Sequence, residues 1–237
     1  MSERKKVVNV NNQDSVWTLV GKEGVLFWTS KMMVDADGHP QAYHPGGSPP
    51  GLDHLANAGK PGNWWGIACD KSGKPYVQKD EHAAPGHYVS TTALVDGNYE
   101  AHHPKRYVHS GEVPYFVLPG SPKLSTVQRL GDIALMFNYA NGRKAYAVYA
   151  DIGPANKIGE GSMRLCEDLG LSSDPKKGGT SQETIATIYF PGSYKGWPRL
   201  AIEMEDQAWL MFGEWGAYDS ARKALPQIDW KQFEKEA

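Results

Sequence analysis

Two carboxylates flank a loop in the stretch YADIGPANKIGEGSMRLCEDLG, residues 149–170. Asp151 ends an apolar, strand-like run, and Glu160 follows after a loop that contains Gly153, Pro154 and Gly159. Burial at a strand end raises the pKa of a carboxyl group, whereas free N–H groups at a helix start favour its charged form. That asymmetry would supply one acid and one base, as glycosidic bond cleavage requires. The alternative is a turn-capping aspartate and an ordinary solvated glutamate.

A second acidic pair, Asp35 and Asp37, lies in KMMVDADGHPQAYHP at residues 31–45. DADG is typical of the opening of a calcium loop, but His39 and Gln41 occupy the next ligand positions, and the required glycine and terminal glutamate are absent. Two interpretations remain, a turn that follows a strand and a contact for a cationic substrate.

Other catalytic chemistries lack their motifs. His102, His103 and His109 are close in sequence, but no cysteine or carboxylate completes a zinc-ligand spacing, and HExxH and GxSxG do not occur. Cys69 has no histidine nearby in sequence, and Cys166 shares a helical face with apolar residues, which is typical of a core position. Phosphate-loop and dinucleotide-binding glycine motifs are also missing. We therefore expect neither a metal nor an organic cofactor.

The composition restricts the partners. The chain of 237 residues has a net charge of -2, so it has no basic excess to hold a nucleic acid or an anionic membrane. No stretch approaches the roughly 20 apolar residues of a membrane span. The N-terminus has a basic start without an apolar run, so no secretory signal is visible and the localisation stays undetermined.

The elements that must position these carboxylates are mainly strands. The 26 glycines and 16 prolines favour many turns, and Asn141-Gly142 between two apolar runs predicts a hairpin. Apolar, β-prone runs predict strands at 16–20, 25–30, 87–94, 113–118, 132–139, 144–151 and 184–190.

Helical signals are few. Residues 162–169 begin at Ser162, a good N-cap, and end before Gly170. The pattern at 199–213 is neither helical nor alternating, and the polar tail at 217–236 has Trp230 and Phe233 as anchors. Residues 39–63 indicate a long ordered loop. We predict a single mainly β domain over residues 1–237, with a closed or near-closed barrel and a few short helices.

An ordered series of segments resembles a known family, the chitosanases of glycoside hydrolase family 75. The resemblance covers about residues 25–195 and leaves a C-terminal extension at 199–237. Its most specific part is the strand-Asp, Gly-Pro loop and GE-x-S segment at 146–170. The other segments are KMMVDADGHPQAYHP (31–45), LANAGKPGNWW (55–65), PYVQ (75–78), YVSTTALVD (88–96), RYVHSGEVPYFVLPG (106–120), LGDIALMFN (130–138) and IATIYFPGS (185–193).

The resemblance implies a β-barrel of the double-psi type, related to the family 45 hydrolases. It also implies that Asp151 and Glu160 are the catalytic pair of an inverting enzyme acting on β-1,4-linked glucosamine polymer. From burial and helix position we expect Asp151 to be the general acid and Glu160 the general base that activates water, although the two roles can be exchanged. Ser162 would cap the helix and orient Glu160.

The remaining candidate residues would bind a polysaccharide, the expected partner. Asp35 and Asp37 would line the cleft and pair with glucosamine ammonium groups, and Trp64, Trp65 or Tyr43 would stack on sugar faces unless they belong to the core. An endo-acting chitosan hydrolase is the leading hypothesis. The alternatives are a hydrolase of another amino-sugar polymer, such as peptidoglycan glycan strands, and a non-catalytic carbohydrate-binding module.

Overall fold

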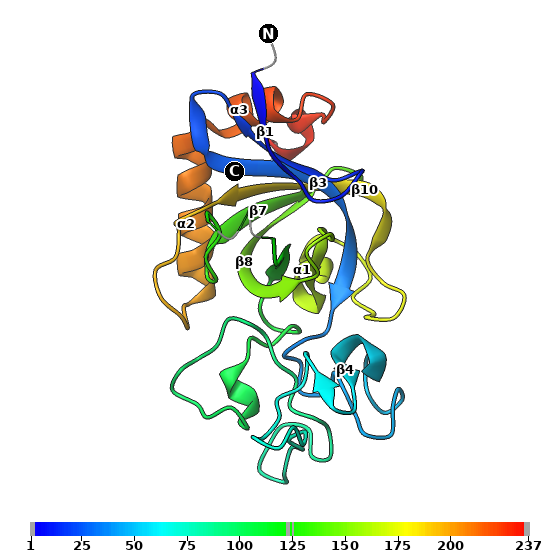
Figure 1. Ribbon diagram of the computed structural model, residues 1–237. Coiled ribbons are helices and arrows are strands. Elements are labelled where there is room, and N and C mark those ends of the chain that lie inside the picture. The colour runs from blue at the N-terminus through cyan, green and yellow to red at the C-terminus, as the bar shows by residue number, and fades with distance from the viewer. Residues whose placement is uncertain (1–2, 122–123, 125, 235–237) are drawn as a thin grey trace.

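The protein is mainly β, and its centre is a closed barrel of six strands in mixed orientation (Figure 1). The computed structural model describes residues 3–121, 124 and 126–234. In barrel order the strands are β3 (Lys22–Asp35), β10 (Thr180–Phe190), β7 (Ile133–Asn138), β8 (Arg143–Gly153), β6 (Tyr115–Pro119) and β9 (Glu160–Ser162). The pairing of β9 with β3 closes the ring. The predicted mainly β class and its barrel core are confirmed.

Strand direction follows the length of the connections. Short turns join β7 to β8 in an antiparallel pair, whereas β8 with β6 and β9 with β3 are parallel and need long crossovers. The hairpin predicted at Asn141-Gly142 is confirmed, with Asn138 opposite Arg143 and Gly142 at φ 77°. A further hairpin of β1 (Arg4–Asn9) and β2 (Ser15–Leu19) extends the sheet beside β3. Strand β1 was not predicted.

The short helix after β9 begins as predicted. Helix α1 (Met163–Asp168) has Ser162 as its N-cap, whose hydroxyl oxygen accepts a hydrogen bond from the N–H of Leu165 at 3.0 Å. Gly170, at φ 70°, follows its end, where a left-handed residue costs little only if it is glycine.

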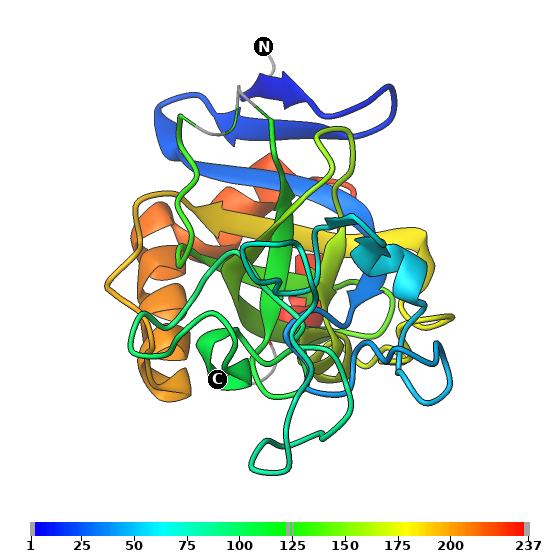
Figure 2. The same cartoon turned by 60° about the horizontal axis from the view of Figure 1, so that its bottom comes forward.

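The C-terminal segment is helical and covers one side of the barrel. Helix α2 (Ala201–Trp215) packs on β7 and β8, and α3 (Ala217–Ala224) and the 3₁₀ turn η3 (Trp230–Phe233) follow (Figure 2). Met204, Ala208, Phe212 and Trp215 are buried at helical spacing, which resolves the ambiguous pattern at 199–213. The predicted anchors Trp230 and Phe233 are 1% and 2% exposed.

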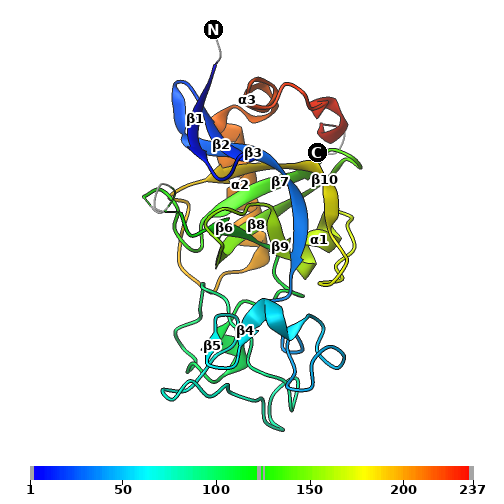
Figure 3. The same cartoon turned by 45° about the vertical axis from the view of Figure 1, so that its right-hand side comes forward.

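Residues 36–112 form a separate layer below the barrel, which we call the loop lobe (Figure 3). Its regular elements are η1 (Leu55–Ala58), β4 (Gly59–Lys60), β5 (Asn63–Trp64) and η2 (Pro104–Arg106). The strand predicted at 87–94 is wrong, because this segment makes only isolated bridges such as Ile67 with Ser90. Its alternating apolar residues, such as Val89 and Leu94, are buried although the segment has no continuous partner strand.

Close packing joins the two ends of the loop lobe. A Cβ atom at Gly38, whose φ is 76°, would lie 2.0 Å from the carbonyl oxygen of Val108, so only glycine fits there.

Across the described residues, no helix has both the length and the apolar character that a bilayer span requires.

Candidate active site

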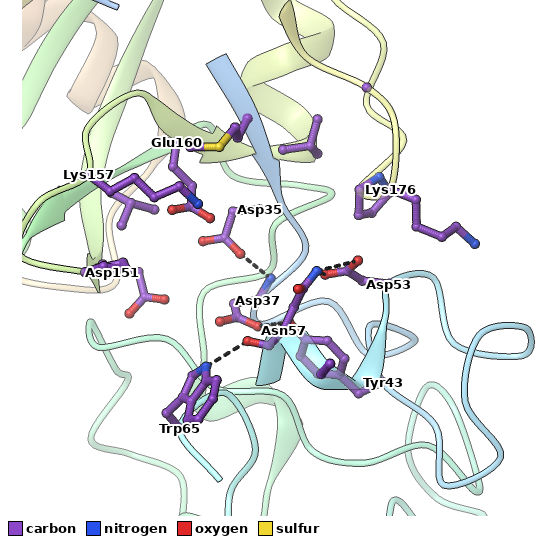
Figure 4. A pocket seen from close by; sticks show the side chains of 18 of the residues that line it. Asp35, Asp37, Tyr43, Asp53, Asn57, Trp65, Asp151, Lys157, Glu160 and Lys176 are labelled. Atoms are coloured by element: carbon purple, nitrogen blue, oxygen red, sulfur yellow. Dashed lines mark hydrogen bonds between the residues drawn. The ribbon is translucent and has the colours of Figure 1, made fainter. Parts of the chain in front are cut away.

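A cavity of about 480 Å³ lies between the barrel rim and the loop lobe (Figure 4). The barrel strands contribute Met33, Val34, Asp35, Val117, Asp151, Ile152, Gly153 and Glu160 to its wall. The loop lobe contributes Asp37, Tyr43, Asp53, Ala56, Asn57 and Trp65, and two further loops add Pro154, Lys157 and residues 175–178. The cavity therefore brings together both acidic pairs predicted from the sequence.

Strand register places Asp151 and Glu160 on opposite sides of one residue. Val117 on β6 is the partner of Asp151 on β8 and also of Glu160 on β9. Directly paired residues point to the same face of a sheet, so the two carboxylates face the same space. Two inter-strand steps of about 4.8 Å separate their Cα atoms by roughly 10 Å. The barrel thus keeps the two groups apart with a strand between them.

Asp151 lies near the end of β8 with one oxygen bound by backbone donors. Its Oδ1 accepts hydrogen bonds from the N–H groups of Ala93 and Ile152, both at 2.9 Å. Burial raises the pKa of Asp151 to about 6, these N–H groups oppose the rise, and the charge of Glu160 adds to it. Asp151 therefore holds its proton to a higher pH than an exposed aspartate does.

Glu160 lies on a strand, not at the helix start that we predicted. It pairs with Met33 of β3, and α1 begins only at Met163, where the Ser162 hydroxyl caps the first turn. The expected dipole effect is therefore replaced by burial, which raises the pKa of Glu160, while the ammonium group of Lys157 opposes the rise. Lys157, rather than the helix, is the charge that favours the ionised form.

Asp35 and Asp37 form the floor of the cavity and share a network with tyrosines. The Oδ1 atom of Asp35 accepts the N–H of Asp37 at 2.8 Å, and the Tyr43 hydroxyl donates to Oδ1 of Asp37 at 2.7 Å. The Tyr115 hydroxyl donates to the backbone carbonyl of Asp37 at 2.9 Å. Burial, and then the neighbouring carboxylates, raise the pKa of both aspartates well above the usual range.

One group of side chains could surround a cation. Oxygen atoms of Asp35, Asp37 and Asp151 lie within 4.8 Å of one another, and no other such group of three occurs in the described part of the chain. Each of these carboxylates already accepts a hydrogen bond from a protein donor. Burial raises the pKa of all three carboxyl groups, which opposes three simultaneous negative charges at this point.

The predicted sugar-binding aromatics occupy three different environments. Trp65 lines the cavity, is 61% exposed and donates its Nε1–H to the carbonyl of Asn57 at 2.7 Å. Trp64 lies outside the cavity wall and packs on Tyr88, with ring centroids 6.0 Å apart. Tyr43 is 2% exposed and reaches the cavity through its hydroxyl group. Of the three, Trp65 has the most exposed side chain.

Ser162 lies behind the cavity wall and is fully buried. Its hydroxyl oxygen accepts the N–H groups of Leu165 and Tyr115 and donates to the carbonyl of Val113. It therefore fixes the junction of β9 and α1 that carries Glu160.

Several residues of the site were not predicted, namely Asp53, Asn57, Lys157, Lys176 and Lys177. Asp53 is 4% exposed, and its two oxygens accept the side-chain amide of Asn57 at 3.0 and 2.8 Å. Lys157 had a usable signal, because it lies in the loop between the two carboxylates. The others come from turns and from η1, and no local sequence pattern predicts how these segments reach the cavity.

Comparison with models of known protein families finds no match for this chain, and comparison with curated proteins finds none either.

Proposed function

We propose that this protein is an inverting endo-glycoside hydrolase that cleaves β-1,4 linkages in chitosan. The observation that carries the proposal is the placement of Asp151 and Glu160 on either side of Val117, facing one cavity. Inverting enzymes hold their carboxyl groups roughly 6.5–9.5 Å apart to admit a water, whereas retaining enzymes need about 5–5.5 Å. Asp151 and Glu160 lie on strands that are not adjacent, and this spacing of their Cα atoms supports the wider class.

The two carboxyl groups take different roles because their surroundings differ. Asp151 has the pKa of about 6, so it can hold a proton and give it to the leaving oxygen. Burial raises the pKa of Glu160 as well, but the Lys157 ammonium group opposes that rise and supports the charged form that activates water. The resemblance to family 75 chitosanases names the same pair, and the exposed ring of Trp65 supplies a surface for a sugar face.

The test is the chemistry of the first product. Wild-type protein should release reducing ends from chitosan, and proton NMR of the initial product should show the α-anomer from a β-linked polymer. A β-anomer appearing first would contradict the inverting mechanism. Binding of chitosan without new reducing ends would indicate a carbohydrate-binding module instead of an enzyme.

A further inference from the structure

We propose that the glycan bound in this cleft carries carboxylate substituents, and that these bind Lys157, Lys176 and Lys177, which we call the lysine rim. The inference rests on the proposed function, because it names the substrate class of the same cavity. It goes beyond that function by adding an anionic group to an amino-sugar polymer.

The lysine rim comes from two loops that meet the same cavity. Lys157 lies in the loop between β8 and β9, and its side chain extends over the cavity beside Glu160 (Figure 4). Lys176 and Lys177 belong to the loop that precedes β10. All three residues are exposed, so their charges face the solvent from which a substrate arrives.

Existing contacts leave the rim largely available. The Nζ atom of Lys176 donates to the hydroxyl of Ser48 at 3.0 Å, which joins the loop before β10 to the loop lobe. Lys177 lies 3.9 Å from Asp174, and its side chain is 83% exposed, where an ion pair contributes little. Neither contact neutralises the rim as a buried salt bridge would.

The charge of the cleft argues for an anionic substituent. Burial, and then repulsion by neighbouring carboxylates, raise the pKa of Asp35 and of Asp37 on the floor well above the usual range, so their charged forms are disfavoured. The cleft is therefore less negative than its five carboxyl groups suggest, and three lysines lie at its edge. The ammonium groups of unsubstituted chitosan find no partner in these lysines, so the lysines add nothing to its binding. A polymer that also carries carboxylates would meet complementary charge there.

The experiment compares two soluble polymers of the same backbone, glycol chitosan and carboxymethyl chitosan. Both are titrated calorimetrically into an Asp151→Asn background, so that binding is read without cleavage. Replacing Lys157, Lys176 and Lys177 together with Gln should raise the Kd for carboxymethyl chitosan about tenfold more than the Kd for glycol chitosan, as a few exposed ion pairs predict. The difference should shrink as salt is added.

A matched control replaces Lys71, Lys79 and Lys195, which are exposed and lie outside the cavity wall, with Gln. It has the same change in net charge and should leave the ratio of the two Kd values unchanged. An equal effect of both triple variants, or of the rim variant on both polymers, would overturn the proposal. Absence of reducing-end release by the wild-type chain would instead contradict the proposed hydrolase, whatever the binding ratio.

Discussion

The barrel and the loop lobe differ in how their backbone N–H and C=O groups find hydrogen-bond partners. In the barrel, every strand lies between two hydrogen-bonded neighbours, and two large clusters of buried side chains fill its inside and outside. In the loop lobe, turns, isolated bridges and side-chain acceptors take that place, around a small cluster that includes Tyr43 and Ile67. Paired strands fix a residue by register, whereas turns fix it only through the contacts of its own loop.

Within the cavity, the candidate reacting groups and the candidate binding group lie on different sides of the boundary between the barrel and the loop lobe. Asp151 and Glu160 belong to barrel strands, and the accessible ring of Trp65 belongs to the loop lobe. Groups that react must be held within a fraction of an ångström, whereas groups that bind a polymer tolerate adjustment. We therefore expect substitutions in the barrel rim to lower kcat, and substitutions in the loop lobe to raise KM.

The largest effect should follow loss of either barrel carboxylate. Asp151→Asn and Glu160→Gln should each lower kcat on chitosan about a thousandfold, because each removes one step of proton transfer. Reducing-end release under saturating substrate measures the change. The circular dichroism spectrum and thermal midpoint should stay close to those of the wild type, since each substituted amide has nearly the same shape as the carboxylate it replaces. Full activity in Glu160→Gln would show that Glu160 is not the base.

A second substitution pair compares the two cores directly. Phe137 is fully buried in the barrel, and its ring lies 5.1 Å from the rings of both Trp230 and Phe233. Phe137→Ala should lower the free energy of unfolding by about 3–5 kcal/mol in chemical denaturation. Ile67→Ala, in the loop lobe, should instead speed hydrogen exchange of residues 36–112 and change the global transition less. Equal losses of global stability would show that the two layers unfold as one unit.

The sequence predicted the barrel better than the loop lobe for a physical reason. Strands such as 132–139 and 144–151 carry their own period and turn signals, so local patterns suffice. Ser162 and Gly170 are likewise local signals of the helix α1 that they flank. The segment 87–94 has the same local appearance, but strand formation needs a partner that the loop lobe does not supply.

The candidate active site likewise contains residues that a local pattern indicated and residues that it did not. Asp151 and Glu160 were candidates because a strand, a loop and a cap lie in one short stretch, and the family resemblance then named the same pair. Asp53 and Lys176 reach the cavity from segments far from that stretch. The surroundings of Glu160 were also predicted wrongly, because the local pattern shows the helix but not the β3 and β6 neighbours that make Glu160 part of a strand.

A smaller effect is expected at the exposed ring of the loop lobe. Trp65→Ala should raise KM for chitosan by some thirtyfold, which corresponds to about 2 kcal/mol of lost apolar contact with a sugar face. Its kcat should change little, because Trp65 lies on the recognition side. Trp64→Phe is the matched control, since Trp64 is outside the cavity wall. A fall in kcat at unchanged KM would place Trp65 in the reaction itself.

The smallest expected effect is a loss of local stability at acidic pH, which should appear in the loop lobe before it appears in the barrel. The rings of His39 and His109 lie 4.6 Å apart, and each Nδ1 accepts a backbone N–H two residues ahead, from Gln41 and Gly111. Burial, and then the neighbouring His109 and His87, lower the pKa of His39 to about 4. Burial also lowers the pKa of His109, against an opposing contribution from Glu112.

Because both pKa values are lowered in the folded protein, folding favours the neutral forms of His39 and His109. An unfolded histidine takes up a proton near pH 6.5, so the stability of this pair is complete above that pH and is lost as the pH falls toward 4. Hydrogen exchange at pH 7 and pH 4.5, corrected for the intrinsic pH dependence, should show lost protection at 36–45 and 107–113 while β7 and β8 stay protected. His39→Gln should reduce this acid sensitivity, whereas His54→Gln, an exposed loop-lobe control, should not. Loss of protection in the barrel at the same pH would mean that acid acts on the whole molecule and not on the histidine pair.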